Sequence, residues 1–267
     1  MNGIVLAVVL VTLIGVLGAA ILVAASKFMA VYEDPRIEQV TEVLAGANCG
    51  GCGYAGCADY AKAIVEDGAP CDKCAPGGAD CVKAVSAIMG VEGGSVLPKR
   101  AYVGCQGTSE NCKTKFDYTG VSTCAAANKL YGGPKSCEYA CLGLGDCTRA
   151  CKFGAIEIKD GVAVVDPDKC TGCGACKDAC PKSVIFLSTM LNQPMVMCSN
   201  HEKGPVAMKE CNTACIACGM CERFCPEEAI KVVDFVARID YDKCTGCGIC
   251  VAKCPKKIID FPMTNER

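Results

Sequence analysis

Residues 244–255 read CTGCGICVAKCP, and the same arrangement of cysteines occurs at 170–181 (CTGCGACKDACP) and at 215–226 (CIACGMCERFCP). Each stretch has the spacing C-x2-C-x2-C-x3-C-P. Three closely spaced thiolates can surround one iron–sulfur cubane, while the fourth cysteine, directed away before the proline, reaches a second cluster. Zinc sites usually have two C-x2-C pairs separated by a longer stretch. The three stretches therefore predict paired [4Fe–4S] clusters rather than zinc.

These motifs lie in a long internal repeat. The chain from Cys124 to Leu187 matches the chain from Cys198 to Phe261 without a gap, at an offset of 74 residues, and nine cysteines coincide. In the first copy AIEI and VAVV flank Asp160-Gly161, a hairpin turn signal, and AIKVV and VARID take the same places in the second copy. Each copy predicts loop–helix, hairpin, loop–helix, and the two copies resemble tandem bacterial ferredoxin modules with two [4Fe–4S] clusters each.

The ferredoxin pattern assigns four thiols to each cluster. The second module has one set at Cys215, Cys218, Cys221 and Cys254, and another at Cys225, Cys244, Cys247 and Cys250. The first module has a complete set at Cys151, Cys170, Cys173 and Cys176. Its other set has Cys141, Cys147 and Cys180, but Leu144 stands where the fourth thiol is expected. Cys137 is the expected replacement, and a three-ligand [3Fe–4S] cluster is the alternative. This module also has Lys152 where the motif has proline.

A further cysteine motif precedes the repeat. Cys49, Cys52, Cys57 and Cys74 follow the spacing C-x2-C-x4-C-x16-C, with glycines between the first three. Glycine lets the backbone approach a cluster closely and donate N–H groups to its sulfurs. Apolar residues recur at helical spacing on both sides of this motif, at 37–46 and 82–89. The segment therefore predicts a small helical domain with a [4Fe–4S] cluster of its own.

The N-terminus predicts a membrane anchor. Residues 3–26 contain no charge, and a helix of this length is about 36 Å long, enough to cross a bilayer. A cleaved signal peptide, the alternative, needs a positive start and a shorter apolar core. Lys27 and Arg36 follow the run, which places the bulk of the chain on the cytoplasmic side of the cell (inner) membrane as a single-pass protein. In a reducing compartment the 27 cysteines favour metal over disulfides, and a net charge of −2 gives no reason to expect nucleic-acid binding.

The combination of apolar anchor, NCGGCGYAGC segment (48–57) and ferredoxin modules is similar to the B subunit of the Rnf complex, in its long form with two modules. This resemblance implies an electron-transfer subunit of a membrane-bound, ion-translocating ferredoxin–NAD oxidoreductase. Reduced ferredoxin would be the donor, and partner membrane and flavin subunits would pass electrons to NAD and translocate Na⁺ or H⁺. The chain has no dinucleotide fingerprint and no P-loop, so it is not expected to bind NAD or ATP itself. The alternatives are a membrane-anchored polyferredoxin of another oxidoreductase and a reducing system for a redox-sensing regulator.

Seven cysteines remain after five clusters have used 20: Cys71, Cys81, Cys105, Cys112, Cys124, Cys198 and Cys211. We expect Cys105, Cys124, Cys198 and Cys211 to hold a sixth [4Fe–4S] cluster where the modules meet, giving about 24 iron atoms per chain. A variant of this set has Cys112 in place of Cys124. The alternative is that the spare thiols are small buried apolar residues. Cys71, Cys81 and Cys112 are expected to stay free.

The predicted fold class is α+β. The expected parts are a transmembrane anchor at 1–26, a helical 4Fe-4S domain at 27–90, and ferredoxin-like modules at 101–190 and 191–267.

Overall fold

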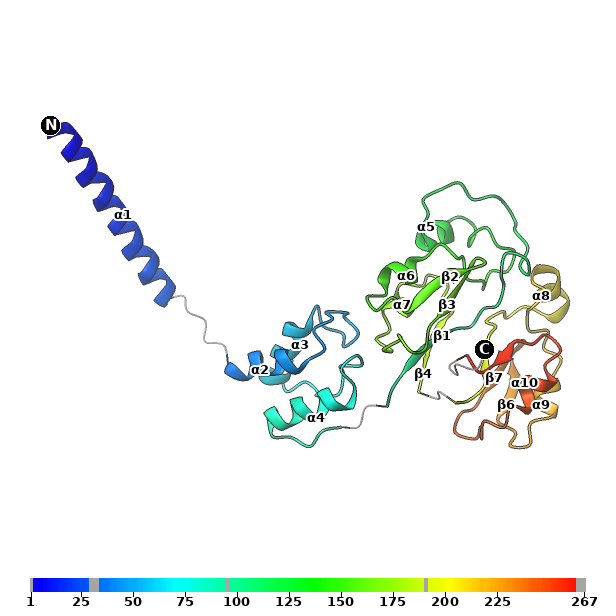
Figure 1. Ribbon diagram of the computed structural model, residues 1–267. Coiled ribbons are helices and arrows are strands. Elements are labelled where there is room, and N and C mark those ends of the chain that lie inside the picture. The colour runs from blue at the N-terminus through cyan, green and yellow to red at the C-terminus, as the bar shows by residue number, and fades with distance from the viewer. Residues whose placement is uncertain (1, 29–33, 95–96, 190–191, 263–267) are drawn as a thin grey trace.

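The computed structural model describes residues 2–28, 34–94, 97–189 and 192–262. The N-terminal helix α1 (Asn2–Phe28) extends away from the rest of the chain (Figure 1). Its segment Val5–Ser26 is the one helix among the described residues that is long and apolar enough to cross a membrane, and its central window is 0% buried by protein. An exposed apolar helix of this length is typical of a membrane-spanning segment, and it coincides with the anchor predicted from the sequence.

Three helices form a small unit after α1: α2 (Pro35–Val43), α3 (Cys57–Glu66) and α4 (Gly78–Met89). Their apolar faces enclose a core that includes Val40, Tyr60, Ile64 and Val85. The Tyr60 hydroxyl donates a hydrogen bond to the Pro70 carbonyl at 2.6 Å and accepts one from the Lys73 backbone N–H at 3.1 Å. A buried phenol thus fixes the loop that carries Cys71 and Cys74.

Each ferredoxin-like module contains the expected hairpin. Strand β2 (Ile156–Lys159) pairs antiparallel with β3 (Val162–Val165), and β6 (Ile230–Val233) pairs with β7 (Val236–Ile239). Asp160 and Gly161 have φ values of 48° and 76°, the left-handed pair that a tight hairpin turn requires. The hairpin predictions are confirmed.

A second strand pair closes each module. Strand β1 (Arg100–Val103) pairs with β4 (Ile185–Ser188), and β5 (Met195–Val196) pairs with β8 (Ile259–Asp260). Val103 lies opposite Ile185, and Val196 lies opposite Ile259. Because Ile185 and Ile259 are equivalent in the 74-residue repeat, Val103 and Val196 are equivalent too. The structural counterpart of Cys198 is therefore Cys105, and the gapless register that aligned Cys198 with Cys124 is wrong at this point.

The remaining helices are short: α5 (Cys124–Lys129), α6 (Asp146–Ala150), α7 (Ala175–Asp178), α8 (Gly204–Glu210), α9 (Met220–Arg223) and α10 (Ile249–Lys253). The helices α6, α7, α9 and α10 each begin after a glycine with positive φ, between 68° and 89°. This left-handed residue turns the chain from the cysteine loop into the helix, which explains the glycine in the motif. The two modules lie side by side and each has its own core (Figure 1).

Candidate iron–sulfur sites

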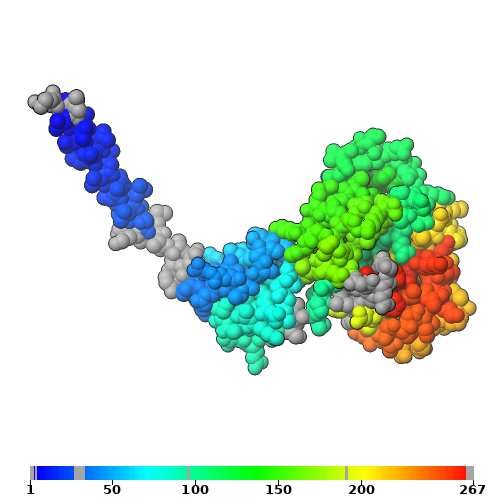
Figure 2. All heavy atoms as spheres, viewed as in Figure 1, coloured from blue at the N-terminus to red at the C-terminus, as the bar shows by residue number. Residues whose placement is uncertain are grey.

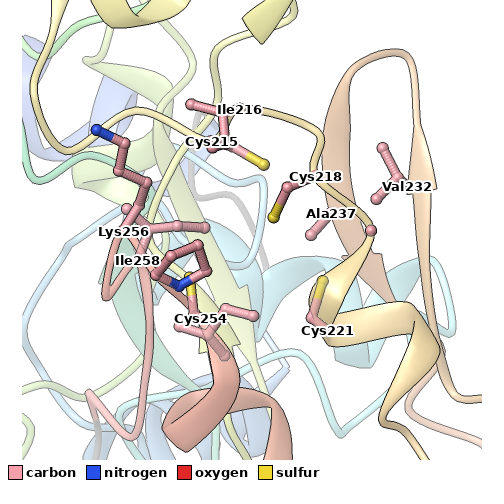
Figure 3. A pocket seen from close by; sticks show the side chains of 12 residues that line it. Cys215, Ile216, Cys218, Cys221, Val232, Ala237, Cys254, Lys256 and Ile258 are labelled. Carbon is pink, nitrogen blue, oxygen red and sulfur yellow. The ribbon is translucent and has the colours of Figure 1, made fainter.

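Three cavities are lined by the thiol sets that the ferredoxin spacing groups together. The first is lined by Cys215, Cys218, Cys221 and Cys254, whose sulfur atoms point toward a common space (Figure 3). The second is lined by Cys225, Cys244, Cys247 and Cys250, and the third by Cys151, Cys170, Cys173 and Cys176. In each case three thiols come from one loop–helix and the fourth from the loop–helix on the other side of the hairpin.

A fourth cavity of the same kind is lined by Cys124, Cys141, Cys147 and Cys180. Cys137, the replacement expected for the missing thiol at Leu144, does not line this cavity, so that expectation is corrected to Cys124. The reason is an insertion: 31 residues separate Cys105 from Cys137, whereas 12 separate Cys198 from Cys211. Helix α5 lies in this longer segment and brings Cys124 to the cavity from outside the cysteine motif.

Helix α5 is held at its first turn by Asp146. The Asp146 carboxylate accepts hydrogen bonds from the backbone N–H groups of Cys124 and Ala125, both at 2.9 Å. Leu144 packs in the same small apolar cluster as Cys124. Leu144, which stands where the motif has a cysteine, therefore packs against helix α5, and α5 carries Cys124.

The four cavities fit the group that the sequence predicts. Each contains four thiols, and their other lining residues are mostly apolar. The thiols surround this space instead of converging on one point, and in the described part of the chain no three Cys, His, Asp or Glu side chains gather closely enough for a single metal ion. A polynuclear cluster needs ligands around its perimeter, whereas zinc binds thiolates at about 2.3 Å from one centre.

Backbone N–H groups point at several of these sulfurs. The Ala155 N–H donates to Cys151 Sγ at 3.4 Å, and the equivalent Ala229 N–H donates to Cys225 Sγ at 3.3 Å. A hydrogen bond donated to sulfur favours the charged thiolate, whereas burial disfavours it. Burial raises the pKa of Cys147 and Cys221 to about 12. These thiols are therefore protonated near neutral pH until iron binds, and binding must release their protons.

Five further thiols gather where the two modules meet. Cys112, Cys137, Cys198 and Cys211 belong to the buried core of the second module, and Cys105 packs against the cores of both modules. The Cys141 N–H donates to Cys105 Sγ at 3.4 Å, and the equivalent Cys215 N–H donates to Cys198 Sγ at 3.3 Å. Three of the thiols predicted for a sixth cluster, Cys105, Cys198 and Cys211, thus lie at this junction together with Cys137, whereas Cys124 lies elsewhere.

Cys112, expected to be free, lies beside Cys211. The two residues form an isolated β-bridge, and the S–H of Cys112 donates to Cys211, which lowers the pKa of Cys211 below its ordinary value. Cys112 lies in the longer segment between Cys105 and Cys137, and no cysteine lies between Cys198 and Cys211 in the second module. The repeat therefore relates Cys105 to Cys198 and Cys137 to Cys211, and leaves Cys112 as the unmatched fifth thiol.

Two buried polar side chains at this junction were missed by the sequence analysis. Asn200 is 1% exposed and its Nδ2 donates to Cys137 Sγ at 3.3 Å. Lys135 is 8% exposed, and its Nζ donates to the carbonyls of Gly107 at 2.6 Å and Gly161 at 2.8 Å. Burial raises the pKa of Cys105, and the positive charge of Lys135 opposes that increase. Nothing in the sequence marks Lys135 as buried, so sequence reasoning had no signal for its role.

The N-terminal unit places its thiols less uniformly. Cys74 lies beside Cys81, whose S–H donates to it and lowers the pKa of Cys74. A Cβ at Gly77 would come within 2.7 Å of Cys81 Sγ and 3.1 Å of Cys74 Sγ, so only glycine fits next to this pair. Cys52 and Cys57 pack against the same core as Cys74, and Cys49 is partly exposed. Cys81, expected to be free, is therefore a neighbour of the predicted ligand Cys74.

Three family models match the cysteine-rich parts of the chain. A putative Fe-S cluster domain matches residues 44–76, a 4Fe-4S binding domain matches 163–186, and a 4Fe-4S dicluster domain matches 214–258. The first match includes Cys74 and ends before Cys81, and the last includes every thiol of the second module's two cavities. Fold and sites together define a multi-cluster iron–sulfur protein with an apolar N-terminal helix.

Three similar proteins extend this class to a particular family, since all three are B subunits of ion-translocating complexes. The chain is 47% identical over 245 residues to that of the Na⁺-translocating ferredoxin:NAD⁺ oxidoreductase complex of Acetobacterium woodii, covering 91% of this chain and 74% of the relative. It is 42% identical over 224 residues to that of the ion-translocating oxidoreductase complex of Methanosarcina acetivorans, covering 84% and 85%. It is 39% identical over 246 residues to that of the proton-translocating ferredoxin:NAD⁺ oxidoreductase complex of Clostridium ljungdahlii, covering 91% and 87%.

The chain belongs to the family of B subunits of the ion-translocating Rnf complexes. It is an electron-transfer subunit with multiple [4Fe–4S] clusters and acts with partner subunits of that complex.

Proposed function

We propose that this chain takes electrons from reduced ferredoxin and delivers them to membrane and flavin subunits, which reduce NAD⁺ and translocate Na⁺ or H⁺. The observation that carries this proposal is the series of four thiol-lined cavities, two in each module, one of which is lined by Cys173 beside Gly51 of the unit that follows α1. A bound [4Fe–4S] cluster supplies one-electron chemistry at a potential set by burial and by hydrogen bonds to sulfur.

The residues proposed to hold clusters follow the cavities. Two sets belong to the second module: Cys215, Cys218, Cys221 and Cys254; and Cys225, Cys244, Cys247 and Cys250. Two sets belong to the first module: Cys151, Cys170, Cys173 and Cys176; and Cys124, Cys141, Cys147 and Cys180. The N-terminal set is Cys49, Cys52, Cys57 and Cys74. The junction set is Cys105, Cys137, Cys198 and Cys211, which follows the equivalence of the two modules.

The arrangement also suggests where electrons enter. All 27 cysteines lie in the described part of the chain, and the two exposed ones, Cys218 and Cys247, line the two cavities of the second module. This module is the part farthest from α1 (Figure 1). We infer that ferredoxin meets the second module, that the helical unit lies nearest the membrane, and that the bulk of the chain is cytoplasmic. The division into an anchor, a helical domain and two modules belongs to the same proposal.

The test is anaerobic stopped-flow mixing of the isolated subunit with reduced ferredoxin. We expect rapid bleaching of the iron–sulfur absorbance, and no rapid bleaching by NADH, because the chain has no dinucleotide fingerprint. Direct rapid reduction by NADH, or no reduction by ferredoxin, would contradict the proposed direction of transfer.

A further inference from the structure

The N-terminal helical unit contacts the first module through one lysine and one glycine. Lys152 Nζ donates to the backbone carbonyls of Ala47 at 3.2 Å and Asn48 at 2.5 Å, residues 105 and 104 positions earlier in the chain. A Cβ built on Gly51 would collide with the backbone carbonyl of Cys173. Figure 2 shows the helical unit, in blue and cyan, against the green first module.

Both contacts lie next to thiols proposed to hold clusters. Ala47 and Asn48 directly precede Cys49, whereas Lys152 directly follows Cys151. Gly51 approaches Cys173, which lines the same cavity as Cys151. The interface therefore joins the Cys49–Cys57 loop of one site to the cavity of another.

Asn48 connects the contact to the interior of the N-terminal site. Its backbone carbonyl accepts from Lys152, while its side-chain Oδ1 accepts from the Cys57 N–H at 2.7 Å. Asn48 has a left-handed backbone conformation with φ 45°. In this conformation its carbonyl faces Lys152 of the first module while its side chain faces Cys57 of its own loop. A contact at Lys152 thereby fixes the segment that presents both Cys49 and Cys57.

Lys152 occupies a position where the other three motifs have proline. The cysteines equivalent to Cys151 are followed by Pro181, Pro226 and Pro255. The loop conformation after the fourth cysteine therefore does not require lysine, and a proline could not supply the ammonium group that bonds Ala47 and Asn48.

We propose that Lys152 is a positioning residue that docks the Cys49–Cys57 loop on the Cys151–Cys176 cavity, so that one electron passes directly between the two sites. The transfer oxidises one site and reduces the other by one electron, and no bond forms or breaks. This proposal rests on the proposed function. Because electron tunnelling weakens steeply with distance, a loop held at the cavity transfers electrons faster than a tethered loop free to move away.

The experiment uses the full chain, purified anaerobically in detergent, with Lys152→Pro and Lys152→Arg. Lys159→Met is the matched control, because Lys159 is an exposed lysine of the same module that pairs with Glu157 away from the interface. Three quantities are measured: iron per chain, hydrogen–deuterium exchange of residues 46–57, and the magnetic interaction between reduced clusters by pulsed electron paramagnetic resonance.

We expect K152P to retain its iron, to exchange residues 46–57 about tenfold faster, and to lose one inter-cluster interaction. K152R should keep both properties because its guanidinium can donate to the same carbonyls, and Lys159→Met should behave as the unsubstituted chain. Unchanged exchange and unchanged magnetic interaction in K152P would overturn the docking role. A chain that binds no iron at residues 49–74 would instead contradict the proposed function, so the two failures are distinguishable.

Discussion

Cys124 lines the cavity with Cys141, Cys147 and Cys180, and we propose that it replaces the ligand missing at Leu144. A substitution test can separate it from Cys137. Cys124→Ala should remove the fourth thiol of the cavity with Cys141, Cys147 and Cys180, leaving a three-iron cluster or about four fewer irons per chain. Iron analysis and the spectrum of the oxidised protein measure this result.

The same site offers a rescue. Leu144 occupies the position of the motif cysteine and packs with Cys124, so Leu144→Cys in the Cys124→Ala background should restore the four-iron cluster. Cys137→Ala, by contrast, should leave this cavity's cluster intact. If the cluster were lost in Cys137→Ala and kept in Cys124→Ala, Cys137 would be its fourth ligand, as the sequence alone predicted.

Lys135 is the residue expected to set the potential of the junction site. Its buried positive charge lies near Cys105 and Cys211 and favours the more negative, reduced form of a bound cluster. Lys135→Met should lower the reduction potential of one component by on the order of 50–100 mV. Potentiometric titration followed by electron paramagnetic resonance checks this shift. Lys113→Met, which removes an exposed charge next to Cys112, is the control, and identical titrations for both variants would argue against the role of Lys135.

At the scale of elements, α5 depends on Asp146 for its position. The carboxylate bonds the first two N–H groups of the helix, where the helix dipole also favours a negative charge. Asp146→Ala should destabilise α5 by about 1–2 kcal/mol and speed hydrogen exchange of residues 124–129. Asp178→Ala removes an exposed carboxylate from α7 and should have little effect. Equal exchange in both variants would show that Asp146 does not hold α5, and that packing and the Thr123 cap are sufficient.

The elements that sequence reasoning identified are those with local signals. The hairpin β2–β3 follows from the Asp160-Gly161 turn, and three thiol sets follow from spacing within a motif. Pairing of β1 with β4 is non-local, because Arg100 and Ser188 meet across the whole module, and no local pattern encodes it. The alignment of Cys124 with Cys198 also failed because strand pairing is non-local. A gapless alignment compares positions along the chain only, whereas the strand pairs show that Cys105 is the counterpart of Cys198 and that the insertion follows it.

At the scale of the whole molecule, the junction thiols decide how the modules behave. Cys105 and Cys137 come from one module, and Cys198 and Cys211 from the other, so a cluster bound by all four is a cross-link as well as a redox centre. Metal binding to the folded state alone adds its binding free energy to stability. Removal of this cluster should therefore loosen the contact between modules while each module keeps its own core and its own cavities.

Replacing Cys105 and Cys198 together by alanine tests this coupling. These two thiols are equivalent and accept N–H groups from Cys141 and Cys215, so their loss affects both modules alike. Iron should fall from about 24 to about 20 atoms per chain, and exchange should rise at the junction but not in the hairpins. About 20 irons in both the unsubstituted chain and the variant would rule out the sixth cluster. In that case the junction thiols would be buried apolar contacts, and the modules would be joined by packing and by hydrogen bonds such as those from Asn200 to Cys137 and from Ser199 to Gly104.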